Sequence, residues 1–298
     1  MDKENREFSD WPAFFRWRPR AVLCVTGEDA FTFLQGQFSN DLRGAVASGA
    51  VYGLWLNHKG RVIADSFVHR VGPEEFWVGS YFCEAGVIRE RLEAFVIADD
   101  VSIEDVTDHW QAVTLLGEHS ERLLAGVADG GFSFVGRRTN GPHREYVFPA
   151  AVDPSIHSRL QGIRELDAED MNRLRIEQGI AAVPADIGLG ELPNEGGLET
   201  VAISYVKGCY LGQEVMARLK NMGQVRRRVM RVKGDGLLPQ LPAALFQGDR
   251  RIGELSTAAR TGDSFVGLAL ISLLYLQRAA GISLAPGGAN TMSLAASS

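Results

Sequence analysis

The chain has 298 residues, of which 45% are hydrophobic and 23% charged, and its formal net charge is −6 at pH 7. These are ordinary values for a globular protein that buries a sizeable core in one large or two moderate domains. The acidic balance argues against a nucleic-acid binder held by bulk electrostatics. No run reaches the roughly 18 apolar residues of a membrane-spanning helix.

The cysteines and histidines exclude several further classes. Three widely separated cysteines provide neither a disulfide framework nor a C-x-x-C metal pair. The six histidines have no metal-ligand spacing, so no residue is assigned to a metal. Residues 1–7 are too charged for a signal peptide. We therefore expect a soluble cytoplasmic protein with no nucleic-acid or membrane partner.

The first half of the chain alternates predicted strands with predicted helices. A buried strand at 20–26 precedes a short helix that Thr26 caps and that ends near Gly36. Strands at 51–56 and 61–69 are joined by Asn57-His58-Lys59-Gly60, a hairpin loop. Further strands are expected at 75–79, 101–106, 111–116 and 144–148, and helices at 84–95 and 119–125. This mixture with hairpins favours an α+β fold over a doubly wound sheet.

The second half predicts a helix, a long loop and a small β unit. Asp167 can cap a helix that ends at Gly179. Residues 181–200 are rich in glycine and proline, and a loop of this length is usually functional or disordered; we expect it to line a ligand. After Gln224, short strands are predicted at 225–233, 243–247, 251–257 and 265–270, with a tight turn at Gly248-Asp249. The tail from residue 281 lacks periodicity and is expected to be disordered.

The most informative run is Lys207-Gly208-Cys209-Tyr210-Leu211-Gly212-Gln213-Glu214. An ammonium two residues before a thiol can favour the thiolate, and the glycines let the backbone approach a ligand closely. The alternative is a small buried cysteine used only for packing. No histidine lies nearby in sequence, so a Cys/His nucleophile pair is not supported. Cys24 and Cys83 are predicted to be core residues.

This run resembles the signature K-G-C-Y-x-G-Q-E of the YgfZ family. These folate-binding proteins are similar to the T-protein (aminomethyltransferase) of the glycine cleavage system and act in iron–sulfur protein maintenance. Residues 33–41, 57–61, 174–180 and 192–195 resemble further blocks of the same family. The resemblance covers about residues 33–218. It implies an α+β, GcvT-like folate-binding domain with mixed or antiparallel sheets and helices at 1–222 and a small C-terminal β-barrel at 223–280, and the composition of 281–298 predicts a disordered tail after them.

The resemblance also implies a cofactor, tetrahydrofolate or a one-carbon derivative, in a central cleft. Its predicted contacts are Asn57, Glu177, Glu195, Tyr205, Gln213, Glu214 and Arg227. The Glu177 carboxylate matches the adjacent N–H donors of a pterin edge; the alternative is a solvated helix face. Glu195 follows the family's P-x-E pattern, against the alternative of a solvated loop acid. Arg227, within a run of three arginines, suits the carboxylates of a folate tail; the alternative is a solvated strand end.

The residues assigned to chemistry are Cys209, Lys207 and Asp65. T-proteins carry an Asp-Asp pair after the hairpin glycine, whereas this chain has Ala64 and Asp65, so the tuning of paired acids is lost. Three functions stay open: a YgfZ-type folate-binding protein with iron–sulfur client or assembly proteins as partners, a folate-dependent aminomethyltransferase or methyltransferase, and a scaffold that has lost the ligand. The sequence leaves open whether the protein is an enzyme.

Overall fold

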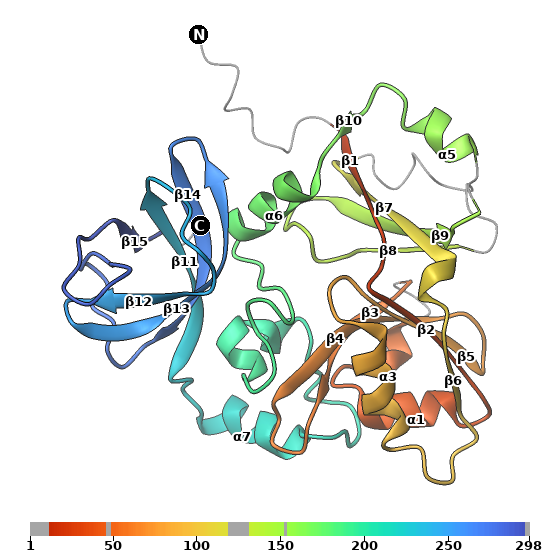
Figure 1. Ribbon diagram of the computed structural model, residues 1–298. Helices are drawn as coiled ribbons and strands as arrows, with labels where there is room; N and C mark the ends of the chain where they lie inside the picture. The colour runs from red at the N-terminus through yellow and green to blue at the C-terminus, as the bar shows by residue number, and fades with distance from the viewer. Residues whose placement is uncertain (1–11, 46–48, 119–130, 152–153, 296–298) are drawn as a thin grey trace. The chain divides into compact units, whose positions relative to one another are not determined.

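The computed structural model describes residues 12–45, 49–118, 131–151 and 154–295 (Figure 1). Two compact units are built from interleaved parts of the chain. The first contains the described residues up to Leu34, together with Asp41–Tyr52 and Ser66–Met171. The second contains Gln35–Asn40, Gly53–Asp65 and the described residues from Asn172 onward. Every segment of the predicted site from Asn57 to Arg227 therefore falls in the second unit.

One sheet has the strand order β10-β1-β7-β9-β8. Its strands are β1 (Ala13–Trp17), β7 (Trp110–Leu116), β8 (Phe132–Phe134), β9 (His143–Pro149) and β10 (Arg164–Glu165). The β1–β10 pair is parallel and the other pairs are antiparallel. The short helix α5 (Pro154–Arg159) contributes Ile156 to the apolar cluster on this sheet. Sequence analysis missed β1, β8, β10 and α5, because elements this short carry little periodicity.

A second sheet has the order β3-β4-β5-β2-β6. Its strands are β2 (Ala21–Thr26), β3 (Val51–Leu56), β4 (Val62–Arg70), β5 (Glu75–Ser80) and β6 (Ser102–Asp105). The helices nearby in sequence are α1 (Ala30–Gln37) and α3 (Ala85–Glu93), with the 3-10 turns η1 (Leu42–Gly44) and η2 (Thr107–His109). The predicted helix at 119–125 lies outside the described residues.

Helix α1 begins at Ala30 and has no cap from Thr26, which corrects the expected cap. The Asp29 carboxylate instead accepts the Asp100 N–H at 2.9 Å, so the turn before the helix is fixed by another loop. Ala30, Phe33 and Leu34 are buried along one side of α1, as the helical spacing predicts.

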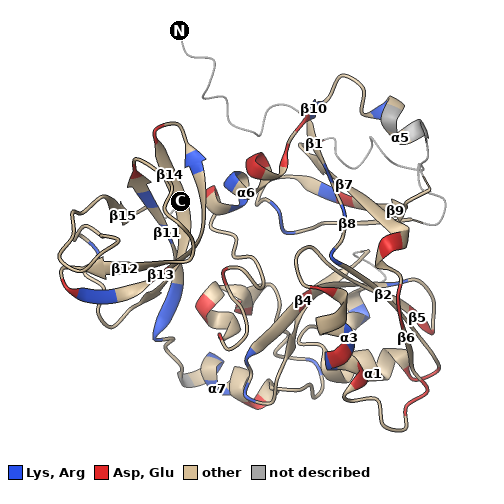
Figure 2. Ribbon diagram, viewed as in Figure 1, with Lys and Arg blue, Asp and Glu red and all other residues tan. Residues whose placement is uncertain are grey.

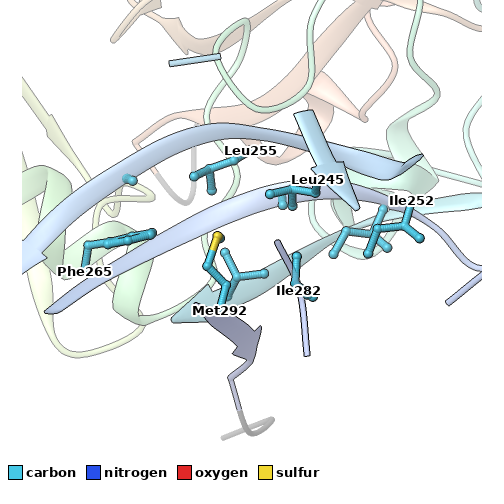
Figure 3. Close-up of a cluster of buried hydrophobic side chains, with 10 residues drawn as sticks. Leu245, Ile252, Leu255, Phe265, Ile282 and Met292 are labelled. Carbon is cyan, nitrogen blue, oxygen red and sulfur yellow. The ribbon is translucent and has the colours of Figure 1, made fainter. Parts of the chain in front are cut away.

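The third sheet is antiparallel, with the order β12-β13-β14-β11-β15. Its strands are β11 (Arg227–Asp235), β12 (Ala243–Gln247), β13 (Arg250–Thr261), β14 (Ser264–Ser272) and β15 (Met292–Leu294). Figure 3 shows Leu245, Ile252, Leu255, Phe265, Ile282 and Met292 packed inside its curve. The sheet is a curled half-barrel, which confirms the α+β class and refines the predicted barrel. Isolated bridges Phe246–Ser283 and Ile282–Met292 link segment 282–283 to the edge strands β12 and β15.

The prediction of a disordered tail from residue 281 is wrong as far as residue 295. Strand β15 pairs with β11, and Ile282 is fully buried in the half-barrel core. Periodicity could not reveal this, because the segment contributes single apolar residues between turns. Its order comes from backbone pairing to strands far away in sequence.

The remaining elements carry the candidate site: α6 (Ala168–Glu177), η3 (Pro193–Gly196), η4 (Leu198–Thr200) and α7 (Gln213–Met222). The segment at 181–200 is irregular apart from its two 3-10 turns, as predicted. No helix in the described ranges is long and apolar enough to cross a membrane.

Candidate functional site

The loop between β3 and β4 is organised by the Asn57 side chain. Its Oδ1 accepts the N–H of Lys59 at 2.9 Å and that of Arg61 at 3.1 Å. This Asx-type turn is a structural role that the site prediction did not anticipate. Gly60 follows with φ of 67°, and a Cβ there would lie 2.9 Å from the Val215 Cβ. The loop therefore packs closely against α7.

The glycine before α7 makes the matching contact. Gly212 has φ of 86°, and a Cβ added to it would lie 2.8 Å from the Asn57 carbonyl oxygen. Only glycine allows this backbone conformation and this approach at the same time. The structure thus brings together two segments that the sequence placed in one site, the hairpin loop and the Lys207–Glu214 motif.

Lys207 is buried, with 4% of its surface exposed, and its ammonium donates to three backbone carbonyls. The acceptors are Gln35 O at 2.5 Å, Phe38 O at 2.6 Å and Asn40 O at 3.1 Å. These carbonyls belong to the end of α1 and the segment after it, where a positive charge is favourable. Lys207 therefore fixes the segment 35–40, and an effect of its charge on the Cys209 thiol stays a prediction.

Cys209 is exposed, whereas Cys83 is buried and Cys24 is intermediate. The burial of Cys83 confirms its assignment to the core. Val206, close to Cys209 in sequence, is 89% exposed. The packing alternative for Cys209 therefore fails, because its side chain is not part of a core. It is an accessible thiol, and an exposed apolar residue lies three positions earlier in sequence.

Glu195 and Arg227, both predicted to contact ligand, hold each other. Arg227 Nε donates to Glu195 Oε1 at 2.9 Å, and Arg227 NH2 donates to Oε2 at 3.1 Å. Glu195 is 5% exposed and also accepts the Leu192 N–H at 2.8 Å. Glu191 lies 3.6 Å from the same guanidinium. Figure 2 shows the basic run at the start of β11 that contains Arg227. Glu195 is therefore not a solvated loop acid, and Arg227 is not simply part of a solvated strand end.

Glu177 is the last residue of α6 and is half-buried. Its carbonyl accepts a hydrogen bond from Arg231 of β11. A carboxylate at the C-terminal end of a helix is unfavourable for the helix dipole. Its position therefore does not serve helix stability.

Asp65 lies in β4 and is 4% exposed, and its neighbour Ala64 is fully buried. The position beside Asp65 is thus occupied by the buried methyl group of Ala64. The two-acid arrangement expected of T-proteins is absent at this position, as the sequence indicated.

Two tyrosines follow the long loop. Burial, then the Glu199 charge, raise the pKa of Tyr205, while a side-chain hydrogen bond with Asn194 lowers it. The Lys220 ammonium lies 4.3 Å from the Tyr205 ring centroid. Burial, with a smaller contribution from Tyr205, raises the pKa of Tyr210 to about 12. Both phenols are therefore neutral at physiological pH.

Gln213 and Glu214 open α7, and the structure separates their roles. Gln213 is half-buried. Glu214 has an 87% exposed side chain and pairs with Arg218 at 2.9 Å, one turn further along the helix. This geometry matches an ordinary surface i,i+4 pair. Gln213 stays a ligand candidate, and Glu214 is a solvent-facing residue.

A buried network that sequence analysis missed supports the same unit. Arg175 NH1 donates to Asp186 Oδ2 at 2.5 Å and to the Ile180 carbonyl at 2.7 Å. Thr257 of β13 donates to Asp186 Oδ1 at 2.6 Å. Arg175 lies in the block at 174–180 that resembles the family, which was the available signal. Its partner Asp186 is eleven residues away in an irregular loop, so the sequence did not reveal the pair. The network ties α6 and the start of the loop to the half-barrel.

Among the described residues, no group of three or more His, Cys, Asp and Glu side chains could hold a metal ion. The site's polar groups are instead carboxylates, amides, phenols and one exposed thiol. They suit hydrogen bonding to an organic ligand.

The fold and these segments define a class of protein. Residues 20–138 match the family described as the GCVT N-terminal domain. The crystal structure of glycine cleavage system aminomethyltransferase T from Bartonella henselae matches with a TM-score of 0.79, covering 97% of this chain and 86% of that one. Sequence identity to it is 17%, so this likeness concerns the fold. The chain therefore has the GcvT-like fold and contains a match to the GCVT N-terminal domain.

Two curated relatives resemble the chain over most of its length. It is 29% identical over 279 residues to the iron–sulfur cluster assembly factor IBA57, mitochondrial, of Mus musculus, covering 86% of this chain and 76% of that protein. The Homo sapiens counterpart is 27% identical over 281 residues, covering 87% and 77%. Because these relatives are named as mitochondrial, the expectation of a cytoplasmic location is wrong.

Proposed function

We propose that this protein supports the assembly or maintenance of iron–sulfur proteins and that it does so with a bound reduced folate, in the manner of the YgfZ type. The similarity to IBA57 assembly factors over most of the chain supports the first part. The GcvT-like fold supports the second. Iron–sulfur client or assembly proteins are the partners this function requires.

The observation that carries the folate proposal is the contact between Gly212 and the Asn57 carbonyl. It joins the hairpin loop to the cysteine motif within one unit, next in sequence to the irregular segment 181–200. Ligand sites combine such preformed walls with a few polar groups. Glu177, half-buried at a helix end, is the proposed acceptor for the two N–H donors of the pterin edge.

Arg227 keeps a role in this proposal despite its ion pairs. A guanidinium has five N–H donors, and the contact with Glu195 uses two of them. The side chain is 40% exposed, so donors remain for a carboxylate of the folate tail. Glu195 is then a positioning residue that sets the orientation of Arg227. Asp65 is the proposed hydrogen-bond partner of a folate nitrogen.

Cys209 is the proposed contact with a partner protein. Its thiol is exposed, and Val206, three residues earlier in sequence, is an exposed apolar residue. A single cysteine cannot hold an iron–sulfur cluster within one chain. A thiolate could instead act on, or bind jointly with, groups that a client protein supplies.

Two experiments test the proposal. Calorimetric titration of the full chain with tetrahydrofolate should give saturable binding that Glu177→Gln weakens. Cells lacking their IBA57-type factor should recover the activity of iron–sulfur enzymes when they express this chain. Tetrahydrofolate binding without recovery of iron–sulfur enzyme activity would support the folate site and reject the assembly role. Recovery of that activity without tetrahydrofolate binding would favour a scaffold that has lost the ligand. Aminomethyl transfer with the lipoyl carrier protein would instead establish the T-protein alternative.

A further inference from the structure

One face of the sheet β10-β1-β7-β9-β8 carries an apolar cluster that the described residues cover only in part. The cluster on that face contains Phe14, Val113, Leu115, Tyr146, Phe148, Ile156 and Leu160. Among the described residues, its cover comes from α5, which has six residues and is therefore about 9 Å long, and from Leu160 and Ile163 after it. The neighbouring strand β7 has seven residues and spans about 23 Å. Within the part of the chain that the structure describes, a helix this short leaves one end of the face open.

The strand register places polar side chains at that open end. Arg16 pairs with Val113, and Gln111 pairs with Phe148, so each polar residue shares a face with an apolar cluster residue. Gln111 also lies two residues before Val113 on β7, again on the same face. The apolar cluster thus ends in a polar border made by β1 and β7.

A cavity of 430 Å³ lies at this border, and its size is typical of small-molecule sites. Val113, Phe148 and Ile156 form part of its apolar wall, and Arg16, Arg18 and Gln111 are its polar lining. An apolar wall with a few polar groups at one end fits a ligand with an apolar body and a polar head.

The charged residues at the border indicate which charge the polar head of the ligand carries. Arg16 is paired with Glu165 at 2.6 Å, and its guanidinium lies 4.8 Å from the Phe14 ring centroid. Arg18 is exposed, and none of the described carboxylates forms an ion pair with it. The cavity therefore has one cation that no described carboxylate neutralises, and a guanidinium binds carboxylates through two parallel hydrogen bonds.

We propose that this cavity is a binding site for a free aliphatic or aryl carboxylate. The apolar body lies against Val113, Phe148 and Ile156, and the carboxylate accepts hydrogen bonds from Arg18. The Gln111 amide donates weakly to the Pro149 carbonyl at 3.4 Å and has a second N–H for the ligand. All these residues belong to the first unit, so the site is independent of the proposed folate site.

Calorimetric titration of the full chain with decanoate and with 4-phenylbutyrate tests the site. Saturable binding is expected, and decanol should bind at least about tenfold more weakly, since a hydrogen bond to a charged group is worth that much or more. Arg18→Gln should weaken decanoate about tenfold. Gln111→Trp should abolish binding by filling the cavity. Arg89→Gln is the matched control, since it removes the same charge from an exposed α3 pair, and it should change nothing.

Absence of binding by both carboxylates would overturn the proposal. Equal affinity for decanol and decanoate would overturn the assignment of a carboxylate head. Binding that survives both Arg18→Gln and Gln111→Trp, in variants whose circular dichroism and melting match the parent protein, would place the ligand elsewhere. Adding saturating tetrahydrofolate should leave decanoate affinity unchanged, so a failure of folate binding does not affect this result.

Discussion

Arg227 binds Glu195 through two parallel hydrogen bonds of 2.9 and 3.1 Å, across 32 positions of sequence. The pair connects the irregular segment before the cysteine motif to the first residue of β11. Glu195 is almost fully buried, and the guanidinium supplies its carboxylate with two hydrogen-bond donors. The contact orients an arginine that remains partly exposed.

Glu195→Gln should destabilise the protein, because a neutral amide replaces a charged acceptor in the pair with Arg227. Hydrogen bonds to charged groups contribute about 1.5–3 kcal/mol, and the exposure of Arg227 reduces this to about 1–2 kcal/mol through solvent screening. Urea unfolding measures the change. Glu214→Gln, at an exposed pair, should stay within about 0.5 kcal/mol. Equal effects of the two substitutions would contradict a special role for the buried pair.

Lys207→Met should be more damaging. It preserves an unbranched side chain but leaves the carbonyls of Gln35, Phe38 and Asn40 without the ammonium. Unsatisfied buried acceptors cost about 1–3 kcal/mol each, so a loss of at least about 2 kcal/mol is expected. The exposed Lys59→Met is the control. If Lys207→Met unfolds like the parent protein but no longer restores iron–sulfur enzyme activity, the role of Lys207 is to act on the Cys209 thiol.

Cys209→Ala should leave the free energy of unfolding within about 0.5 kcal/mol, as is usual for an exposed position. It should abolish recovery of iron–sulfur enzyme activity in cells that lack their own factor. In the native protein, iodoacetamide should modify Cys209 well before the buried Cys83, as peptide mass spectrometry can measure. Full recovery of iron–sulfur enzyme activity by Cys209→Ala would show that the thiol is not needed for the function.

Glu177→Gln should weaken tetrahydrofolate by at least about tenfold, because one charge-assisted acceptor of the pterin edge is lost. Calorimetry on a variant with parent-like melting measures it. Glu169→Gln, in the first turn of the same helix, is the matched control. If both variants bind as the parent does, Glu177 lies outside the ligand site.

The stability of the protein should fall between pH 10 and 12, in part through Tyr210. Its pKa is raised to about 12 in the fold, against about 10 in the unfolded chain. Above pH 10 the unfolded state loses its proton first, so unfolding becomes easier as pH rises, by at most about 3 kcal/mol for this group. Tyr210→Phe should remove that part of the slope in denaturant titrations. An unchanged slope would show that other groups carry it.

Much of the fold followed from local patterns. The hairpin loop with Gly60, the strand at 51–56 and the turn at Gly248-Asp249 were predicted because their signals lie within a few residues. The strand β15 was not predicted, because its stability comes from pairing with β11 about sixty positions earlier.

The sequence by itself determined the α+β class and the likeness to GcvT-like proteins, and it singled out the run from Lys207 to Glu214 as a candidate site. Each of these depends on residue order and spacing. Only the tertiary structure decided what the side chains do: that Lys207 binds carbonyls near α1, that Glu195 and Arg227 pair, and that Cys209 is exposed. The physical reason is that the partners of a buried charge are chosen by packing, and packing brings together residues that are far apart in the chain.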